Sequence, residues 1–460
     1  MLFKKILLGC FLLLFLSCVT KKKTFDIRDF GAQADTLTVN TIAIQKAINA
    51  CHKQGGGKVV VSNGTYITGT VLLKNNVHLV IHENGVLKGS SNPLDYQSID
   101  MFTDATGQER GNCLIGAVNA KNIGVSGKGI IDGNGAAFLH KNLVKERRRL
   151  HILESNKTFG KNRPFLLRFV KSSKIHVKGI QLREPAAWTC HFYQSSNIQI
   201  EEVSIYSHAN FNNDGIDLDS SSAVSIKNCT IDTGDDAICF KTTSPIPTHD
   251  IKVSECSLKS EWGAIKFGTE SMGDFYNILV TDCVINDTRG GGIKILSVDG
   301  ANITNVTIKN IKMNAVDMPI FVRLGERLRT YRNTPKQKVG SIDKLLIKNI
   351  QATTQSIEKL RVNPPSGILI TGTPAYDIGT VKLEDISINL PGGGKKANIK
   401  LVDEQVAAYP EFSFFGMLPA YGIYGRHIKK ITLSNVNFKI ENPDERAQII
   451  LEDVDNKIIN

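Results

Sequence analysis

Residues 197–203 read Asn-Ile-Gln-Ile-Glu-Glu-Val, and shorter versions of this stretch recur along the chain. Aliphatic residues with a polar step between them return at Ala223–Ile226, Asp250–Val253 and Asn277–Val280. The marker positions 175, 198, 224, 251, 278 and 303 are 23 to 27 residues apart, a period typical of solenoids. Between the markers aliphatic and polar residues alternate, which favours strands over helices. We therefore predict an all-β fold, a single-domain right-handed parallel β-helix.

Three cysteines fall at one position of successive repeats. Cys229, Cys256 and Cys283 are each 27 residues apart, so we expect them to stack as buried thiols in neighbouring coils. A metal site would need closely spaced His or further Cys ligands, which this spacing lacks. Nine cysteines in 460 residues are also too sparse for a disulfide scaffold. We expect no metal and no other cofactor.

Residues 40–57 are the one convincing amphipathic helix that the sequence predicts. Ile44, Ile48 and Cys51 belong to its apolar stripe, Asn40 is the expected N-cap, and a run of three glycines ends it. Because a solenoid needs a cover over its end, we expect this helix to cap the first coils. No linker divides the chain beyond it, so residues 25–460 are predicted to form one β-helix domain.

The first residues resemble a bacterial export signal. Two lysines precede an apolar run from Ile6 to Leu16, which is too short to span a membrane comfortably. The junction Ser17-Cys18 resembles the lipobox of lipoproteins, and an ordinary signal with an incidental cysteine is the alternative. We expect residues 1–17 to be the signal peptide, Cys18 the lipidation site and residues 18–24 a tether. The expected location is the cell envelope, in the outer membrane or the periplasm, with the lipid as the only membrane contact.

The charge of the chain indicates an acidic partner. Its formal net charge is +12, and basic proteins bind nucleic acid, anionic membranes or acidic polymers. For an exported protein the acidic polymer is the expected partner, and nucleic acid is not.

Acidic residues align when neighbouring repeats are superposed. Residues 214–219, Asp-Gly-Ile-Asp-Leu-Asp, match residues 236–241, Asp-Ala-Ile-Cys-Phe-Lys, at a step of 22. Asp214 and Asp236 should therefore lie one rung apart, about 4.8 Å by strand spacing, with Asp235 beside them. Such crowding raises at least one carboxyl pKa and suits glycoside hydrolysis, in which one carboxyl protonates the leaving oxygen and another activates water. A solvated acidic turn, a calcium site and a calcium-dependent β-helix polysaccharide lyase remain open on this argument.

Two motifs in these coils resemble those of glycoside hydrolase family 28, the polygalacturonase family. Asn212-Asn213-Asp214 is similar to the family's Asn-x-Asp motif, and Gly234-Asp235-Asp236 is similar to its Gly/Gln-Asp-Asp motif. The resemblance implies inverting hydrolysis of O-glycosidic bonds in a pectic polysaccharide or its oligosaccharides. It makes Asp235 the general acid, with Asp214 and Asp236 holding the attacking water. A rhamnogalacturonan-type hydrolase of the same family is the alternative.

Two departures from the family motifs concern the substrate. Trp262 stands where the family usually has the histidine of Gly-His-Gly, and Gly292 replaces the arginine of Arg-Ile-Lys, whereas Lys294 keeps the lysine. Lys266 falls in the same outward column as Lys294, so we predict that both lysines hold a uronate carboxylate. Trp262 would then offer a stacking face for the neighbouring sugar. Balancing the acidic residues is the alternative role of the lysines.

Three further residues are predicted to contact the substrate. Asn212 belongs to the motif that contains Asp214, and Arg323 offers a planar fork that suits a carboxylate. His191 lies just ahead of the acidic coil, where a hydrogen-bonded loop residue is the alternative.

Residues 409–421 are too aromatic and irregular for a coil and predict a long ordered loop. If this loop walls off one end of the substrate groove, the enzyme is exo-acting on a galacturonate-type residue, which is our prediction. A cover over the last coils is the alternative.

Overall fold

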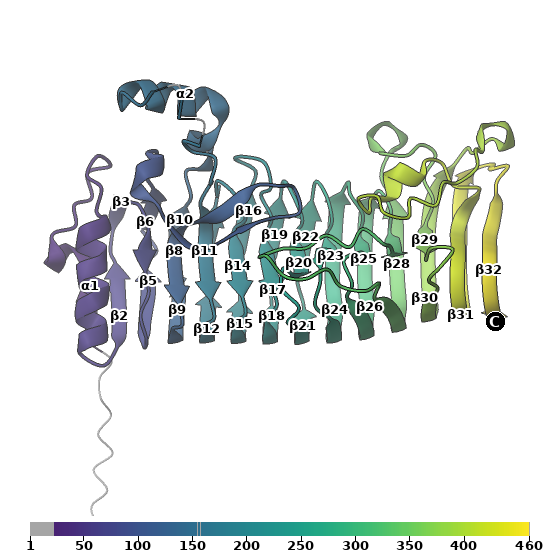
Figure 1. Ribbon diagram of the computed structural model, residues 1–460, viewed down its shortest axis with the longest axis horizontal. Coiled ribbons are helices and arrows are strands. Elements are labelled where there is room, and N and C mark those ends of the chain that lie inside the picture. Colours follow the sequence, from purple (N-terminus) through teal and green to yellow (C-terminus); the bar gives the residue numbers. More distant parts are fainter. Residues whose placement is uncertain (1–22, 154, 157, 460) are drawn as a thin grey trace, which may run out of the picture.

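In a computed structural model, strands stack along one axis from Thr24 to Ile459 (Figure 1). The structure describes residues 23–153, 155–156 and 158–459. The predicted signal peptide and Cys18 lie outside these residues. The first strand begins at Thr24, which pairs with Lys58 and so belongs to the fold rather than to the predicted tether. Among the residues described, no helix is both long and apolar enough to cross a membrane.

Parallel pairing between successive turns divides the strands among three faces of the stack. Face 1 contains β1 (Thr24–Asp26), β2 (Gly57–Val61), β5 (Val77–Ile81), β9 (Lys121–Gly127), β12 (Ser173–Lys178), β15 (Ser196–Glu201), β18 (Ser222–Lys227) and β21 (Thr248–Ser254). Face 2 contains β3 (Gly64–Thr68), β6 (Gly85–Gly89), β10 (Ile130–Asp132), β13 (Gln181–Arg183), β16 (Ser204–Ser207), β19 (Thr230–Thr233) and β22 (Ser257–Ser260). Face 3 contains β4 (Val71–Leu72), β8 (Glu109–Val118), β11 (Phe165–Val170), β14 (Cys190–Tyr193), β17 (Ile216–Asp219), β20 (Ile238–Thr242), β23 (Ile265–Ser271), β25 (Ile293–Ser297), β27 (Ile320–Leu324) and β29 (Ile368–Thr371).

The later coils use longer strands that continue from one face to the next. These are β24 (Phe275–Thr288), β26 (Asn302–Val316), β28 (Ser341–Thr354), β30 (Ile378–Gly392), β31 (Ala420–Asn442) and β32 (Ala447–Ile459). One strand, β7 (Gln97–Thr103), runs antiparallel to β8. This arrangement confirms the predicted parallel β-helix.

Buried aliphatic columns hold the stack together. On face 3, Ile216 pairs with Ile238, Ile238 with Ile265 and Ile265 with Ile293, and all four side chains are fully buried. Each buried isoleucine contributes roughly 2 kcal/mol of hydrophobic free energy. Seven described cysteines are free, buried thiols, and Cys229, Cys256 and Cys283 occupy one position in successive turns as predicted.

The predicted capping helix is present as α1 (Thr41–Lys53) and covers the N-terminal end (Figure 1). Its buried residues include Ile44, Ile48 and Cys51, as predicted. Asn40 is the N-cap residue of α1, as predicted, but its side chain makes no capping bond to the helix. The Asn40 amide instead bonds to Gln33 and to backbone carbonyls at Thr38 and Ile67, so it fixes the entry loop.

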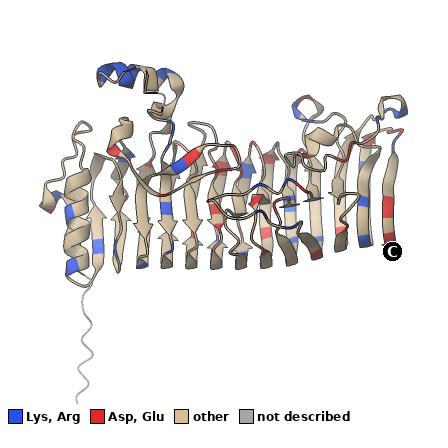
Figure 2. Cartoon of the chain, viewed as in Figure 1, with Lys and Arg blue, Asp and Glu red and all other residues tan. Residues whose placement is uncertain are grey.

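A second helix, α2 (His140–Arg149), was not predicted. It buries none of its residues fully and has basic residues along most of its length, so it lacks the apolar stripe by which α1 was found. It stands away from the stack at one edge (Figure 2). Short 3-10 turns complete the structure: η1 (Ile27–Phe30), η2 (Pro93–Asp95), η3 (Gly135–Phe138), η4 (Ile357–Lys359), η5 (Lys396–Asn398) and η6 (Phe412–Phe415).

Two apolar clusters cover the outer side of face 3. Towards the N-terminus, Phe102 of β7 packs with Phe165 and Trp188. Towards the C-terminus, Phe412 and Phe415 of the predicted loop pack on outward side chains of β25 to β31. The loop is ordered, as predicted. The strands that follow the acidic motifs lie between these two clusters in the strand order.

Candidate active site

Three carboxylates meet where the chain enters β17 and β20. Gly215 donates to the carbonyl of Asp236 at 2.8 Å, which sets Asp214 and Asp236 on adjacent rungs, as the superposed repeats predict. Oxygens of Asp214, Asp235 and Asp236 all lie within 4.8 Å of one another. The Asp235 carbonyl is fixed by the hydroxyls of Thr233 and Ser260 at 2.6 and 2.7 Å.

The surroundings of the three acids separate their pKa values. Burial, followed by the charge of Asp236, raises the pKa of Asp235 to about 6. Burial, followed by Asp217 and Asp235, raises the pKa of Asp214 well above its usual value. Burial also acts to raise the pKa of Asp236, but the charge of Lys266 and of further lysines outweighs it and lowers the pKa. Neighbouring carboxyl groups with pKa values driven apart are typical of acid and base pairs.

Accessibility decides which acid can deliver a proton. Asp214 and Asp236 are buried, whereas Asp235 is half-buried and reaches the surface. One oxygen of Asp214 is buried without a hydrogen-bond partner among the described residues. Asp235 therefore suits the proton donor, and Asp214 offers a free acceptor beside the ionised Asp236.

A lysine that sequence reasoning missed lies at the centre of the site. The Nζ of Lys241 is 3.4 Å from oxygens of Asp214, Asp217 and Glu270, and 4.4 Å from the centroid of Trp188. Lys241 pairs with Asp219 in the strand register, so the alternation of the repeat could have placed it on the outward side. Together with Lys266 it supplies positive charge to the acids. The same cluster of carboxylates has the donor atoms for a cation, and the lysines compete with that role.

The predicted lysine column is present, and both of its side chains are buried. Lys266 pairs with Lys294 in the register, and the two side chains are only 4% and 0% exposed. Lys266 Nζ is 2.6 Å from Asp236, and Lys294 Nζ is 2.5 Å from Glu411 in the C-terminal loop. Protein carboxylates pair with both lysines, which fits the alternative role of balancing acidic residues, and uronate binding by the lysines stays a prediction. Glu411 lies 117 residues from Lys294 in sequence, and no sequence pattern predicts the contact.

Two other predicted substrate contacts are also buried. Arg323 is 2% exposed and donates to the carbonyls of Gly372, Glu404 and Gln405, so it anchors a loop. His191 is fully buried, 3.3 Å from Asp219. Burial lowers the pKa of His191 to about 4, which keeps the ring neutral. The burial of both side chains gives no support to the predicted substrate contacts, which stay untested. His191 is hydrogen-bonded, as its alternative states, but it lies in β14 and not in a loop.

Asn212 and Trp262 lie at the edge of the acid cluster. The Asn212 side-chain oxygen accepts bonds from Gln108, Arg110 and Arg163 at 2.9 to 3.1 Å, which fixes the turn before Asp214. Trp262 is half-buried, and the guanidinium of Arg361 lies 4.0 Å from its ring centroid. One face of the indole is therefore already stacked. Asn212 has a positioning role in this structure, and Trp262 remains a candidate contact.

A family model places this site among known enzymes. Residues 90–408 match the model of the glycosyl hydrolases family 28, and this stretch includes all three acids. The chain belongs to glycosyl hydrolases family 28. It is a glycosidase of the polygalacturonase family, and the match favours hydrolysis over the lyase alternative.

Curated relatives and solved structures agree with this membership. The family 28 chain is 26% identical over 432 residues to an exo-poly-alpha-D-galacturonosidase from Dickeya chrysanthemi, covering 83% of this chain and 70% of the relative. It is 25% identical to an exopolygalacturonase from Zea mays over 395 residues, covering 81% and 85%.

The family 28 exopolygalacturonase of Yersinia enterocolitica superposes with a TM-score of 0.74 at 21% identity, covering 94% of this chain and 78% of that one. A hyperthermoactive exopolygalacturonase from Thermotoga maritima gives a TM-score of 0.67 at 21% identity, covering 91% and 92%. At this identity the two structures show the shared fold alone.

Proposed function

We propose that the protein removes galacturonate-type residues from an end of a pectic polysaccharide or its oligosaccharides by hydrolysis. The observation behind this proposal is the half-buried Asp235, with its raised pKa, beside the ionised Asp236. Relatives named as exopolygalacturonases support the substrate class and the exo mode. The two apolar clusters that cover face 3 on both sides of the site also support cleavage near a chain end.

The proposed reaction uses each carboxyl in one role. Asp235 donates its proton to the glycosidic oxygen while the bond from that oxygen to the anomeric carbon breaks. Asp236 takes a proton from a water that Asp214 helps to orient, and the water oxygen bonds to the anomeric carbon. The donor ends ionised and the acceptor protonated, so exchange with solvent restores the starting state.

The stereochemical outcome rests on the family resemblance. Inverting enzymes usually separate their two carboxyls by about 6.5 to 9.5 Å, so that water fits between them. The oxygens here lie within 4.8 Å, closer than that range. Inversion therefore remains a prediction, and the anomeric configuration of the first product tests it.

An exposed cation beside the site favours an acidic substrate. The guanidinium of Arg361 donates to the carbonyls of Arg289 and Glu261, and no described carboxylate lies within ion-pair distance of it. Arg361 is exposed, unlike Lys266 and Lys294. Its neighbour Trp262 lies one turn of the solenoid after Asp235. Arg361 thus offers a uronate the charge that the buried lysines do not.

Parallel incubations with two substrates test the proposal against its alternatives. Oligogalacturonates and rhamnogalacturonan oligosaccharides are supplied separately, and reducing ends, ultraviolet absorbance and product length are followed. Hydrolysis of oligogalacturonates with new reducing ends, one short product and an inverted anomer by proton NMR is expected. An ultraviolet-absorbing unsaturated product would identify a lyase, mixed early products would identify endo cleavage, and turnover of rhamnogalacturonan alone would change the substrate.

We also propose export and attachment to the cell envelope through a lipid on Cys18. The basic start, the short apolar run and Ser17-Cys18 support it. Radiolabelled fatty acid should enter the wild type and not Cys18→Ala, and Cys18→Ala should leave the membrane fraction. Equal labelling of both would contradict the proposal.

A further inference from the structure

Three side chains that can bind a metal meet at one corner of the solenoid, towards its C-terminal end (Figure 1). They are Asp377, which directly precedes β30, His427 of β31 and Asp453 of β32. The residues that follow them pair with one another in the strand register, so the three occupy the same position in successive turns. One nitrogen of His427 and one oxygen of each aspartate all lie within 4.8 Å of one another.

His427 cannot donate from both of its ring nitrogens as a neutral imidazole. It is 9% exposed, its Nε2 lies 3.2 Å from Glu404, and its Nδ1 lies 2.6 Å from Asp453. A neutral ring has a hydrogen on only one nitrogen. Arg426 holds Glu404 with a 2.8 Å hydrogen bond, so a hydrogen on Nε2 is well placed to donate to that carboxylate. The lone pair of Nδ1 then faces a carboxylate oxygen, and a second proton or a cation must lie between the two atoms.

The second aspartate of the corner favours the cation. Asp377 has no hydrogen bond or ion pair among the residues that the structure describes, although its carboxylate lies beside His427 and Asp453. Neither aspartate forms an ion pair with a described lysine or arginine. Two carboxylates so close repel each other, and one protonated imidazole balances only one of the two charges. A divalent cation bound to the neutral ring balances both.

The ligand atoms fit zinc. Zinc in proteins accepts imidazole nitrogen and carboxylate oxygen at about 2.0 to 2.2 Å, which places the ligand atoms of a tetrahedral site about 3.3 Å apart. Asp377 and Asp453 reach the surface, so small movements of their side chains close the cluster around an ion, with water as the fourth ligand. The contact between Nε2 and Glu404 supplies the outer carboxylate that usually orients a ligating histidine.

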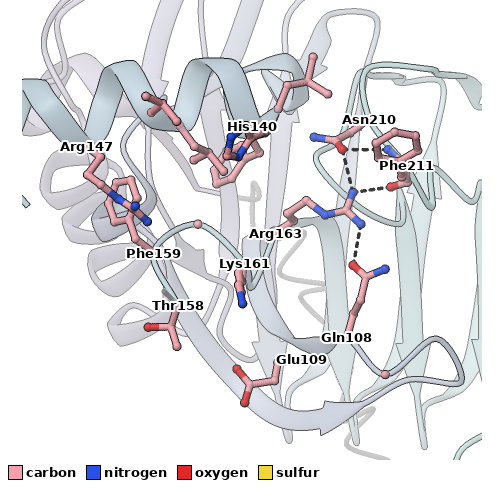
Figure 3. Close-up of a pocket in the computed structure, with 16 residues that line it drawn as sticks. Gln108, Glu109, His140, Arg147, Thr158, Phe159, Lys161, Arg163, Asn210 and Phe211 are labelled. Carbon is pink, nitrogen blue, oxygen red and sulfur yellow. Dashed lines mark hydrogen bonds between the residues drawn. The ribbon is translucent and has the colours of Figure 1, made fainter. Parts of the chain in front are cut away.

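Other parts of the molecule suit a cation less well. The acid cluster of the active site already contains lysines that pair with its carboxylates. The cavity beside α2 is lined by Arg147, Lys161 and Arg163, and Glu109 is the one acidic residue of its lining (Figure 3). The corner combines two aspartates and a histidine without a basic side chain paired to either aspartate.

We propose that Asp377, His427 and Asp453 bind a zinc ion that joins three successive turns of the solenoid. Each turn supplies one ligand, so the ion links β32 to the two turns before it. This strand gains most from the link, because none of its described residues is fully buried. The site is independent of the proposed function. Spacing in the sequence does not predict it, because the ligands come from separate segments.

Calorimetry with zinc chloride at neutral pH tests the site, on full-length protein without an affinity tag and after treatment with a chelator. The wild type should bind one ion per chain with a Kd of about 1 μM or below. Asp377→Asn removes a ligand that has no other described partner, so it should weaken binding about tenfold or more with the fold unchanged, and His427→Gln should weaken it at least as much. His249→Gln is the matched control, because His249 pairs with Asp250 at 2.8 Å and has no third ligand among the described residues. It should change the Kd by less than about twofold, since it removes no ligand.

Hydrogen exchange locates the effect of the ion. Saturating zinc should slow amide exchange in β32 about tenfold or more in the wild type and not in Asp377→Asn, because the ion stabilises only the closed turn. A wild type that binds no zinc, or binding that both ligand variants retain, would overturn the proposal. An equal loss in His249→Gln would overturn it as well.

Two further results separate this site from the active site. Zinc binding that Asp235→Asn abolishes would place the ion at the acid cluster and contradict the corner site. Zinc binding that only the corner variants remove would support the site even where the wild type hydrolyses no pectic glycan, so the site and the proposed function can fail separately.

Discussion

On faces 1 and 3 of the solenoid, side chains that point outward form a column along the stack. The column on face 3 is buried, whereas the column on face 1 is exposed to solvent. On face 3 the column comprises Asp217, Cys239, Lys266, Lys294 and Phe321, and each of these side chains is buried. On face 1 the corresponding column comprises Gln199, Ser225, Lys252, Leu279 and Thr307, and each is half or fully exposed.

The difference comes from what lies over each face. Strand alternation sends a side chain outward, but the loops packed on face 3 decide whether it meets water. A charge in the covered column must find a protein partner, since an unpaired buried charge is costly. A charge in the open column on face 1 is solvated and contributes little to the free energy of unfolding.

The largest effect on catalysis is expected from removing the carboxyl group of Asp235 at the covered face 3. Asp235→Asn deletes the proton donor and should lower kcat by roughly 100- to 10,000-fold with the fold unchanged by circular dichroism. Asp250→Asn changes an exposed aspartate on face 1 and should leave kcat unchanged. Wild-type turnover by Asp235→Asn would assign the donor elsewhere.

The lysines of the two columns should differ in their contribution to stability. Lys294→Met leaves Glu411 buried and unpaired and should lower the free energy of unfolding by about 3 to 5 kcal/mol. Lys252→Met, in the open column, should change it by less than about 0.5 kcal/mol.

The double variant sharpens this comparison. Adding Glu411→Gln to Lys294→Met removes the unpaired charge and should recover part of the lost stability in denaturant titrations. Equal losses in Lys294→Met and Lys252→Met would show that the ion pair does not stabilise the covered face.

The smallest expected effect is a change in pH dependence. Asp236 must be ionised to accept a proton, and Lys266 at 2.6 Å helps to hold its pKa below the usual value. Lys266→Met should raise that pKa, so the acid limb of kcat/KM moves to higher pH and activity at mildly acidic pH is lost first. The basic limb of the wild type should reflect Asp235, whose pKa is about 6. Lys252→Met should keep the wild-type profile, and an unmoved acid limb in Lys266→Met would contradict the role of this ion pair.

Local repetition made the fold and the acid cluster predictable from sequence. The period of the Ile and Val markers defined the coils, and superposing residues 214–219 on 236–241 placed Asp214 and Asp236 on adjacent rungs, as found. Both inferences need only neighbouring repeats, which the chain brings together by its own periodicity.

Contacts between distant segments were not predictable in the same way. The partner of Lys294 is Glu411, which comes from an irregular loop. Arg323 donates a hydrogen bond to the carbonyl of Glu404. Alternation gave the correct direction for Lys266 and Lys294 and could not show that a loop covers them. Helix α2 was missed because most of its residues are charged or polar and none of them is fully buried, so it has no apolar stripe of the kind that identified α1.

The seven buried thiols give the molecule internal reporters of its own opening. They are distributed from Cys51 in α1 to Cys283 in β24, and in the closed stack none is accessible to a reagent. Each becomes modifiable only when its own turn opens, so the rates of native-state thiol labelling would give a local opening free energy at seven positions along the axis. A gradient from Cys51 inward would mean that the solenoid unravels from its capped end, and uniform rates would mean that it opens as one cooperative unit.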